Sequence, residues 1–205
     1  MIKEDPGKTL GQLNLKSPQP ETYHRALTEW ARWNSGPAYK WLEENSPNLS
    51  AEEINYSLSG LSRAECLQEK WSEAWSIAGE ISDPKIKKAA TGQIWQLERH
   101  AIRKKVEKDP LATQNELLSE GSPHADYWLE ESVSVWLEKD AEAVYEWYDG
   151  KRKSIPAEKA QYVAAAFAKK AVAIGDLATA REWTGKIQHP KTRERIQSMI
   201  SESEN

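Results

Sequence analysis

The chain has 205 residues, of which 39% are hydrophobic and 29% charged, and its formal net charge is −4. This length is enough to bury a core, whereas so mild a charge argues against nucleic acid or a membrane surface as the default partner. The single cysteine, Cys66, excludes an internal disulfide, and the lack of a long apolar run or a secretory signal predicts a soluble chain whose compartment stays open.

Residues 1–20 combine several prolines and glycines with almost no hydrophobic periodicity, which predicts a flexible N-terminal lead-in. From residue 21 onward, helical patterns alternate with loops rich in Pro, Gly, Asn and Ser. Several loops supply a helix start, and Ser50 with Glu53 has the spacing of a capping box. No segment has the alternation of a strand. The expected helices are 21–33, 36–44, 51–66, 69–81, 84–106, 110–119, 124–138, 140–149, 157–174, 176–187 and 190–203.

These helices pair along the chain into five predicted hairpins with short connections. The hairpins are 21–44, 51–81, 84–119, 124–149 and 157–187, and the last helix closes the stack. We therefore expect an all-α fold, a right-handed α-solenoid of about five helical hairpins plus a terminal capping helix. Residues 21–205 would form a single helical-repeat domain.

Internal similarity supports a repeated architecture. Trp30 and Trp41 are eleven residues apart with a tyrosine two before the second, and Trp136 and Trp147 share this arrangement. Aligning Trp41, Trp75, Leu117, Trp147 and Trp183 as one structural position gives successive units of 34, 42, 30 and 36 residues. The pattern favours a duplicated ancestry over a regular repeat.

The predicted helix 84–106 carries two apolar stripes. Ile86, Ala90 and Ile94 belong to one stripe at helical spacing, whereas Ile102 and Val106 belong to another, rotated about 100° around the axis. A helix flanked on two sides needs two stripes. We expect this helix in the interior of the stack.

The last predicted hairpin resembles a tetratricopeptide unit. Ala164, Phe167, Ala168 and Ala171, followed by Gly175-Asp176-Leu177 and Ala180, match its small and large positions over 161–187. The chain is also similar to the Trp-rich, degenerate helical repeats of some large bacterial proteins. The resemblance implies a binding scaffold whose closely packed antiparallel helices present a surface to another protein.

Motifs for catalysis, metals and cofactors are missing. The chain has no His-Glu-x-x-His helix, no Gly-rich phosphate loop and no Gly-x-Ser-x-Gly, and its four histidines lie far apart. Adjacent acids such as Glu130 and Glu131 diverge on a helix, and we interpret them as solvated. We therefore expect no cofactor, no metal site and no catalytic residue, although distant repeats could still assemble one.

Four residues are candidates for binding. Most tryptophans recur at matching places in their hairpins, which favours packing, but Trp33 and Trp128 lie beside stripes that are already filled and are the better candidates for exposure. Arg99 and Arg103 share a face within a basic stretch that fits either a solvated helix face or an anion patch. The stretch contains Lys85, Lys87, Lys88, Arg99, Arg103, Lys104, Lys105 and Lys108.

The resulting hypothesis is a non-catalytic protein-interaction scaffold. A concave surface built from the first helices of successive hairpins would bind a peptide or helix. The alternative is a helical enzyme or carbohydrate-binding module that uses exposed tryptophans. Nucleic-acid contact through the basic helix is a third possibility, against which the lack of aromatic–basic interleaving argues. The sequence leaves the oligomeric state open.

Overall fold

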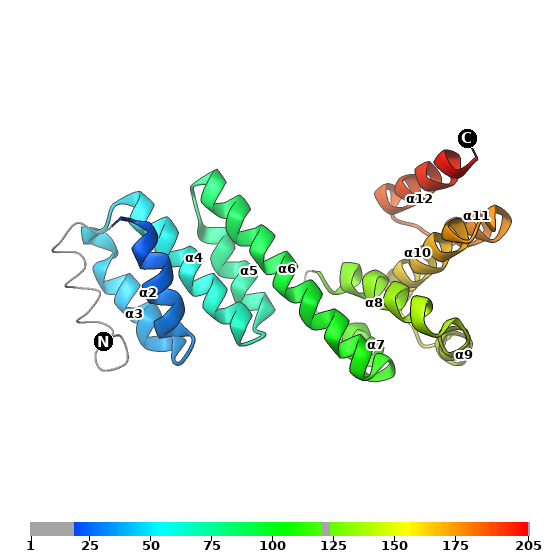
Figure 1. Ribbon diagram of the computed structural model, residues 1–205, viewed down its shortest axis with the longest axis horizontal. Coiled ribbons are helices and arrows are strands. Elements are labelled where there is room, and N and C mark those ends of the chain that lie inside the picture. The colour runs from blue at the N-terminus through cyan, green and yellow to red at the C-terminus, as the bar shows by residue number, and fades with distance from the viewer. Residues whose placement is uncertain (1–18, 120–123, 205) are drawn as a thin grey trace. The chain divides into compact units, whose positions relative to one another are not determined.

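The computed structural model describes residues 19–119 and 124–204, and every regular element in this part of the chain is helical. The all-α prediction is confirmed, and each of the eleven α-helices ends within two residues of its predicted limits (Figure 1). Of the predicted lead-in, residues 1–18 lie outside the described chain. The helices are α2 Glu21–Ala31, α3 Ser35–Asn45, α4 Ala51–Leu67, α5 Trp71–Glu80, α6 Pro84–Lys108, α7 Pro110–Ser119, α8 Ala125–Lys139, α9 Ala141–Lys151, α10 Ala157–Ala173, α11 Leu177–Gly185 and α12 Pro190–Ser203, with a 3-10 turn, η1, at Ser46–Asn48.

The chain divides into two compact units. Unit 1 extends to His100 and unit 2 begins at Ala101, so that α6 crosses the boundary. Compactness within each unit does not decide whether the two fold together. The single domain over 21–205 therefore stays a prediction.

In unit 1, helix α4 is the centre of the packing. It contacts α2, α3 and α5, and the Ser50–Glu53 capping box that the sequence predicted starts it. Tyr23, Leu27 and Leu61 are fully buried in the core between these helices, and Ala90 and Ile94 of α6 belong to the same core.

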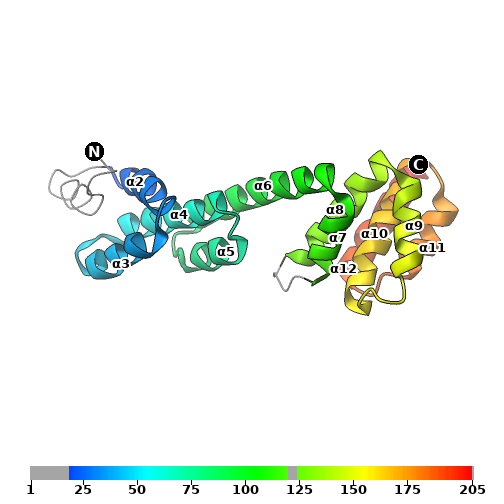
Figure 2. The same cartoon turned by 90° about the horizontal axis from the view of Figure 1, so that it is seen from below.

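In unit 2, helix α10 has the corresponding central role. It contacts α8, α11 and α12, whereas α7 and α9 both pack on α8. Figure 2 shows α9 and α11 together at one side of α10. Ala165, Ala166 and Ala168 are buried on α10, because short side chains let the neighbouring helices approach closely.

The two units repeat one order of helices at a fixed spacing of 106 residues. Helices α3 and α9 have both ends 106 residues apart, as have α4 and α10. Helices α5 and α11 begin at this spacing, and so do α6 and α12. Among the described residues, the two with positive φ, Glu69 at 57° and Gly175 at 77°, occupy the same place after α4 and α10.

A tryptophan pair recurs at this spacing and packs within each unit. The rings of Trp30 and Trp41 have centroids 6.5 Å apart between α2 and α3, and those of Trp136 and Trp147 are 5.8 Å apart between α8 and α9. These tryptophans act as wedges between helices. The proposed equivalence of Trp75 with Trp183 is off by two residues, because Ile77 occupies the corresponding position of α5.

A side-chain amide also holds the same loop in both units. Asn55 Oδ1 of α4 accepts hydrogen bonds from the backbone N–H of Ser82 and Asp83 at 2.8 and 3.4 Å, just before α6. Gln161 Oε1 of α10 accepts one from His189 at 2.7 Å, just before α12. In both units the amide fixes where the next helix starts.

Helix α6 uses its two apolar stripes one after the other along its length. Ala90 and Ile94 are buried in unit 1, and Ile102 and Val106 are buried in unit 2. The rotation between the stripes therefore marks the boundary between the units. The interior position that the sequence analysis assigned to α6 stays a prediction.

No helix in the described ranges 19–119 and 124–204 is long and apolar enough to cross a membrane.

The crossing of α2 and α4 depends on a glycine. A Cβ atom at Gly60 would lie 2.4 Å from the carbonyl oxygen of His24, a contact that real Cβ atoms do not make. We therefore expect Gly60→Ala to lower the free energy of unfolding by about 1–3 kcal/mol, because the two backbones must separate. Urea denaturation measures the change.

Gly92→Ala is the matched control for this substitution. Gly92 lies inside α6, and a Cβ there would meet nothing within 4 Å. Alanine should stabilise that helix by about 0.5–1 kcal/mol. Equal effects at the two glycines would show that helix propensity, not the close crossing, governs Gly60.

Candidate functional site

Two buried carboxylates on α8 organise the most highly charged part of unit 2. The first is Glu130, which is 4% exposed. Arg195 of α12 donates from Nη2 to both of its oxygens, at 2.8 and 2.7 Å. Lys169 of α10 donates to Oε1 at 3.2 Å. Glu130 thus holds three helices together through charge.

The second carboxylate is Glu131, which is 8% exposed. Arg103, near the end of α6, donates to its Oε1 from Nε at 3.2 Å and from Nη2 at 2.9 Å. Adjacent residues diverge by about 100° around a helix, so the two acids face different neighbours as the sequence analysis expected. The interpretation of both as solvated side chains is wrong, because each is covered by a neighbouring helix and its cation.

We call these five side chains the charged network: Glu130, Glu131, Arg103, Lys169 and Arg195. Its acids are buried and its cations are partly exposed, with 46% of the Arg103 side chain, 28% of Lys169 and 45% of Arg195 accessible. Removing a carboxylate from water is costly unless charge and hydrogen bonds replace the lost hydration. The network meets this condition and presents its positive groups outward.

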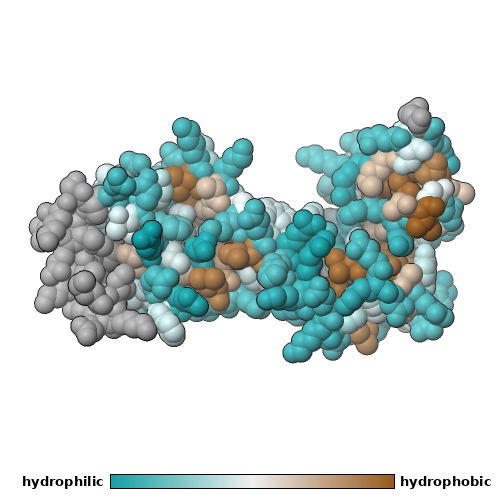
Figure 3. All heavy atoms as spheres, viewed as in Figure 1, coloured by the Kyte–Doolittle hydropathy of each residue, from teal (hydrophilic) through white to brown (hydrophobic). Residues whose placement is uncertain are grey.

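This arrangement suits binding more than proton transfer. Both carboxylates already accept charged hydrogen bonds, which stabilise the ionised form and leave no poised acid or base. The accessible sides of the three cations can still attract an anionic group. The face drawn in Figure 3 is mainly hydrophilic, with hydrophobic residues only in small separate groups.

The two predicted tryptophans lie in opposite environments. Trp33, in the turn after α2, is 73% exposed, and the guanidinium of Arg32 lies 5.9 Å from its ring centroid. Trp128 is 1% exposed inside unit 2, where it packs edge-on against Tyr127. The predicted exposure of Trp128 is wrong, because this helix face packs into the unit and leaves the ring no surface to offer.

The two predicted arginines belong to different units. Arg103 is part of the charged network, and Arg99 is an exposed residue of α6 in unit 1. Other members of the basic stretch have partners too: Lys105 pairs with Glu116 at 2.7 Å, and Lys87 donates to the carbonyl of Gly79 at 2.6 Å. These contacts agree with the interpretation of a polar helix face beside acidic neighbours.

Sequence reasoning missed Glu130, Lys169 and Arg195. The two cations follow the carboxylate by 39 and 65 residues, and no local pattern links them. Only the packing of α10 between α8 and α12 brings the three charges together.

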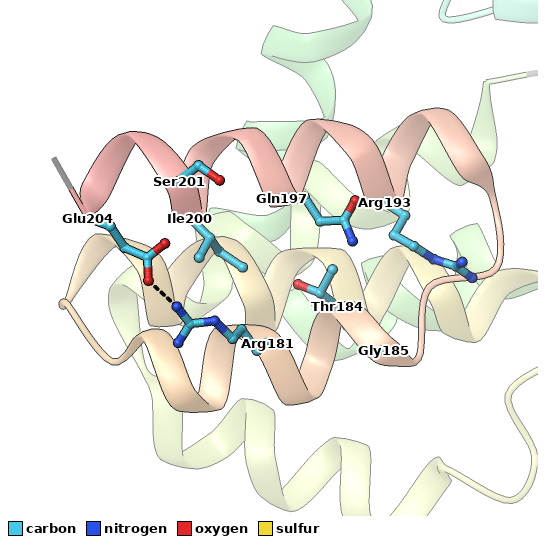
Figure 4. A pocket seen from close by; sticks show the side chains of 8 residues that line it. All are labelled: Arg181, Thr184, Gly185, Arg193, Gln197, Ile200, Ser201 and Glu204. Carbon is cyan, nitrogen blue, oxygen red and sulfur yellow. Dashed lines mark hydrogen bonds and ion pairs between the residues drawn. The ribbon is translucent and has the colours of Figure 1, made fainter.

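A hollow of about 530 Å³ between α11 and α12 is a weaker candidate (Figure 4). Arg181 forms an ion pair with Glu204 across it, and Arg193 donates to the carbonyl of Ile187 at 2.7 Å. The Arg181–Glu204 pair lies 106 residues after a hydrogen bond from Trp75 to Glu98. Its cations are already used in a contact that recurs in both units, which favours a structural role.

Two tyrosines, Trp183 and Lys186 line another hollow, of about 450 Å³, between α9 and α11. The ring of Trp183 stacks on Phe167 with centroids 4.5 Å apart, and the Lys186 ammonium lies 3.7 Å from its centroid on the other side. Both faces of the indole are therefore covered by the chain itself.

Other reactive groups in the described residues lack the setting of a catalytic site. Burial raises the pKa of the Cys66 thiol to about 12, and the charge of Glu98 adds to the shift. Buried Glu65 lies 3.5 Å from the ammonium of Lys70. The described ranges contain no group of three or more His, Cys, Asp or Glu placed to hold a metal ion.

Comparison of the chain with protein-family models, with curated proteins and with solved structures returned no match.

The charged network makes a testable contribution to stability. Glu130→Gln leaves Lys169 and Arg195 without their counter-charge, and we expect the free energy of unfolding to fall by about 1–3 kcal/mol. The loss stays moderate because both cations are partly hydrated. Glu138→Gln, at an exposed position of the same helix, should change it by less than about 0.5 kcal/mol. A Glu130→Gln protein as stable as the parent would contradict this role.

Proposed function

We propose that this chain is a non-catalytic protein-interaction scaffold that binds a peptide or helix of another protein. Its helices would form a tetratricopeptide-like, right-handed α-solenoid of about five hairpins with a capping helix. The binding surface would be the concave face built from the first helices of successive hairpins.

The charged network is the observation that carries this proposal. Its side chains come from α6, α8, α10 and α12, which begin the proposed hairpins or cap the stack. The network orders three long basic side chains before a partner arrives, which reduces the entropy lost on binding. Partly exposed cations above buried acids favour partners that carry negative charge.

The span of the Arg195–Glu130 pair supports a curved surface. Helix α10 packs against both α8 and α12, yet a side chain of α12 reaches a carboxylate of α8. Packed helices are about 8–10 Å apart between axes, so this reach is easier when the outer two helices tilt toward each other. Such a tilt would make this side of the row concave, as a peptide groove requires.

The alternative function, a carbohydrate-binding module or helical enzyme that uses exposed tryptophan, retains one supporting residue. Trp33 offers an accessible indole face with Arg32 beside it. Sugar sites combine such a face with converging polar groups. The scaffold is the stronger proposal, since it rests on five connected side chains.

Photo-cross-linking from two exposed tyrosines tests the proposed binding face. Tyr127 on α8 is 41% exposed and lies one helical turn before Glu130, whereas Tyr145 on α9 is 47% exposed on the other side of unit 2. Each is replaced by benzoylphenylalanine in the full chain and irradiated in source lysate. We expect specific adducts from position 127 that weaken with salt, and few from position 145.

Both variants must melt at the temperature of the parent protein for the comparison to hold. Equal adducts from the two positions, or adducts only from position 145, would place binding elsewhere and contradict the proposal.

Iodide quenching of tryptophan fluorescence tests the alternative. Trp41, Trp128, Trp136, Trp147 and Trp183 are buried, so Trp33 should provide the largest single share of the accessible emission. Trp33→Phe should therefore lower the quenchable fraction without changing the melting temperature. A sugar that protects Trp33 from iodide would favour the carbohydrate-binding alternative.

A further inference from the structure

Unit 1 contains a hollow of about 340 Å³ between α2, α4 and α6, which we call the α2–α4–α6 pocket. Its wall includes Glu21 and His24 of α2, Tyr56 of α4, and Lys85, Ala89 and Gln93 of α6. The 106-residue spacing makes this place directly comparable with its counterpart in unit 2.

The counterpart in unit 2 is the Glu130 half of the charged network. Position 24 corresponds to Glu130, position 63 to Lys169 and position 89 to Arg195. In unit 2 the carboxylate and the two cations neutralise one another and fill the space between the helices. In unit 1 the same three positions hold His24, Arg63 and Ala89.

One part of this place has the same chemistry in both units. The Tyr56 hydroxyl donates to Glu21 at 3.2 Å, and Tyr162, at the corresponding position, hydrogen-bonds with Asp126. Glu21 is therefore engaged as its counterpart is. The difference between the units lies in the carboxylate and the arginine.

The substitutions at positions 24 and 89 explain why unit 1 has a hollow. Ala89 ends at its Cβ, where Arg195 extends a long side chain toward α8. His24 replaces the acid, so the carboxylate is missing as well. The result is a cavity whose wall has lost one negative and one positive group but keeps the remaining cation.

That remaining cation is Arg63, a partly buried residue on α4. It follows Tyr56 and Ser59 of the pocket wall by seven and four residues, so it lies on the same face of the helix. Its charge lowers the pKa of His24, which burial lowers first. Among residues 19–119 and 124–204, Arg63 forms no printed ion pair, whereas its counterpart Lys169 binds Glu130.

The lining therefore favours an incoming anion. Arg63 and Lys85 supply positive charge, and His24 stays neutral near pH 7 and adds no negative charge. A partly desolvated guanidinium gains most from a carboxylate that it can bind with two hydrogen bonds. A carboxylate held there would occupy the place that Glu130 occupies in unit 2.

We propose that the α2–α4–α6 pocket binds the carboxylate of a glutamate or aspartate side chain presented by a partner peptide or helix. This inference rests on the proposed scaffold function and names the chemistry of one of its contacts. Unit 2 carries its own carboxylate at this place, whereas unit 1 takes one from the partner. The two units, alike in fold, thus differ in what they bind.

Three labelled alanine-rich helical peptides, identical except for a central Glu, Gln or Lys, are the probes. Fluorescence anisotropy with the full chain measures their affinities at low and moderate salt. We expect the Glu peptide to bind at least about tenfold more tightly than the Gln peptide, and the Lys peptide to bind most weakly. Arg63→Gln should remove the preference for Glu.

A double variant tests the pocket without emptying it. His24→Glu with Ala89→Arg copies the residues of unit 2 into unit 1, so the chain itself would supply the carboxylate and fill the hollow. We expect it to fold, as judged by circular dichroism and melting temperature, and to lose the preference for the Glu peptide. Arg63→Gln gives an independent answer if the double variant folds poorly.

Several results would overturn the inference. A preference for the Lys peptide would show that Glu21 dominates the pocket, and equal binding of all three peptides would show that it recognises no charge. Tighter binding of inorganic phosphate than of the Glu peptide would assign the pocket to a free anion. Adducts from position 127 without any preference among the peptides would sustain the scaffold and reject this pocket alone.

Discussion

The buried carboxylate of Glu130 is the constraint on which the arrangement of unit 2 depends. An ionised acid at 4% exposure is stable only if opposite charge reaches it from the surrounding structure. Lys169 and Arg195 supply that charge from α10 and α12, so the acid fixes the mutual positions of three helices. The same requirement orients the long basic side chains whose outer edges form the proposed binding surface.

Unit 1 solves the equivalent packing problem without a buried ion pair at this place. Gly60 allows α2 and α4 to approach so closely that a single added carbon would meet the His24 carbonyl. Unit 2 has Ala166 at the corresponding position, and α8 and α10 must leave room for its methyl group. Close backbone approach in one unit and charge pairing in the other stabilise the same order of helices. The repeated tryptophan pairs and amide-held loops account for what the two units share.

Local patterns predicted the helices well because each signal acts within a few residues. Proline and the capping residue Ser50 mark helix starts, and hydrophobic periodicity marks the buried face. The candidate site was harder to predict. Trp128 and Trp33 are alike as isolated residues, yet one is buried and the other exposed, because burial depends on which helices pack against them. Glu130 and Glu131 resembled solvated acids for the same reason.

The sequence by itself determined the helical class, the limits of the helices, the wedge role of most tryptophans and the absence of known catalytic motifs. These properties follow from propensity, capping and periodicity, which are local. Tertiary structure alone decided that Glu130 meets Lys169 and Arg195, and that His24 and Ala89 leave a hollow at the corresponding place. Such contacts join residues tens of positions apart, and the free energy of burying charge depends on the whole surrounding packing.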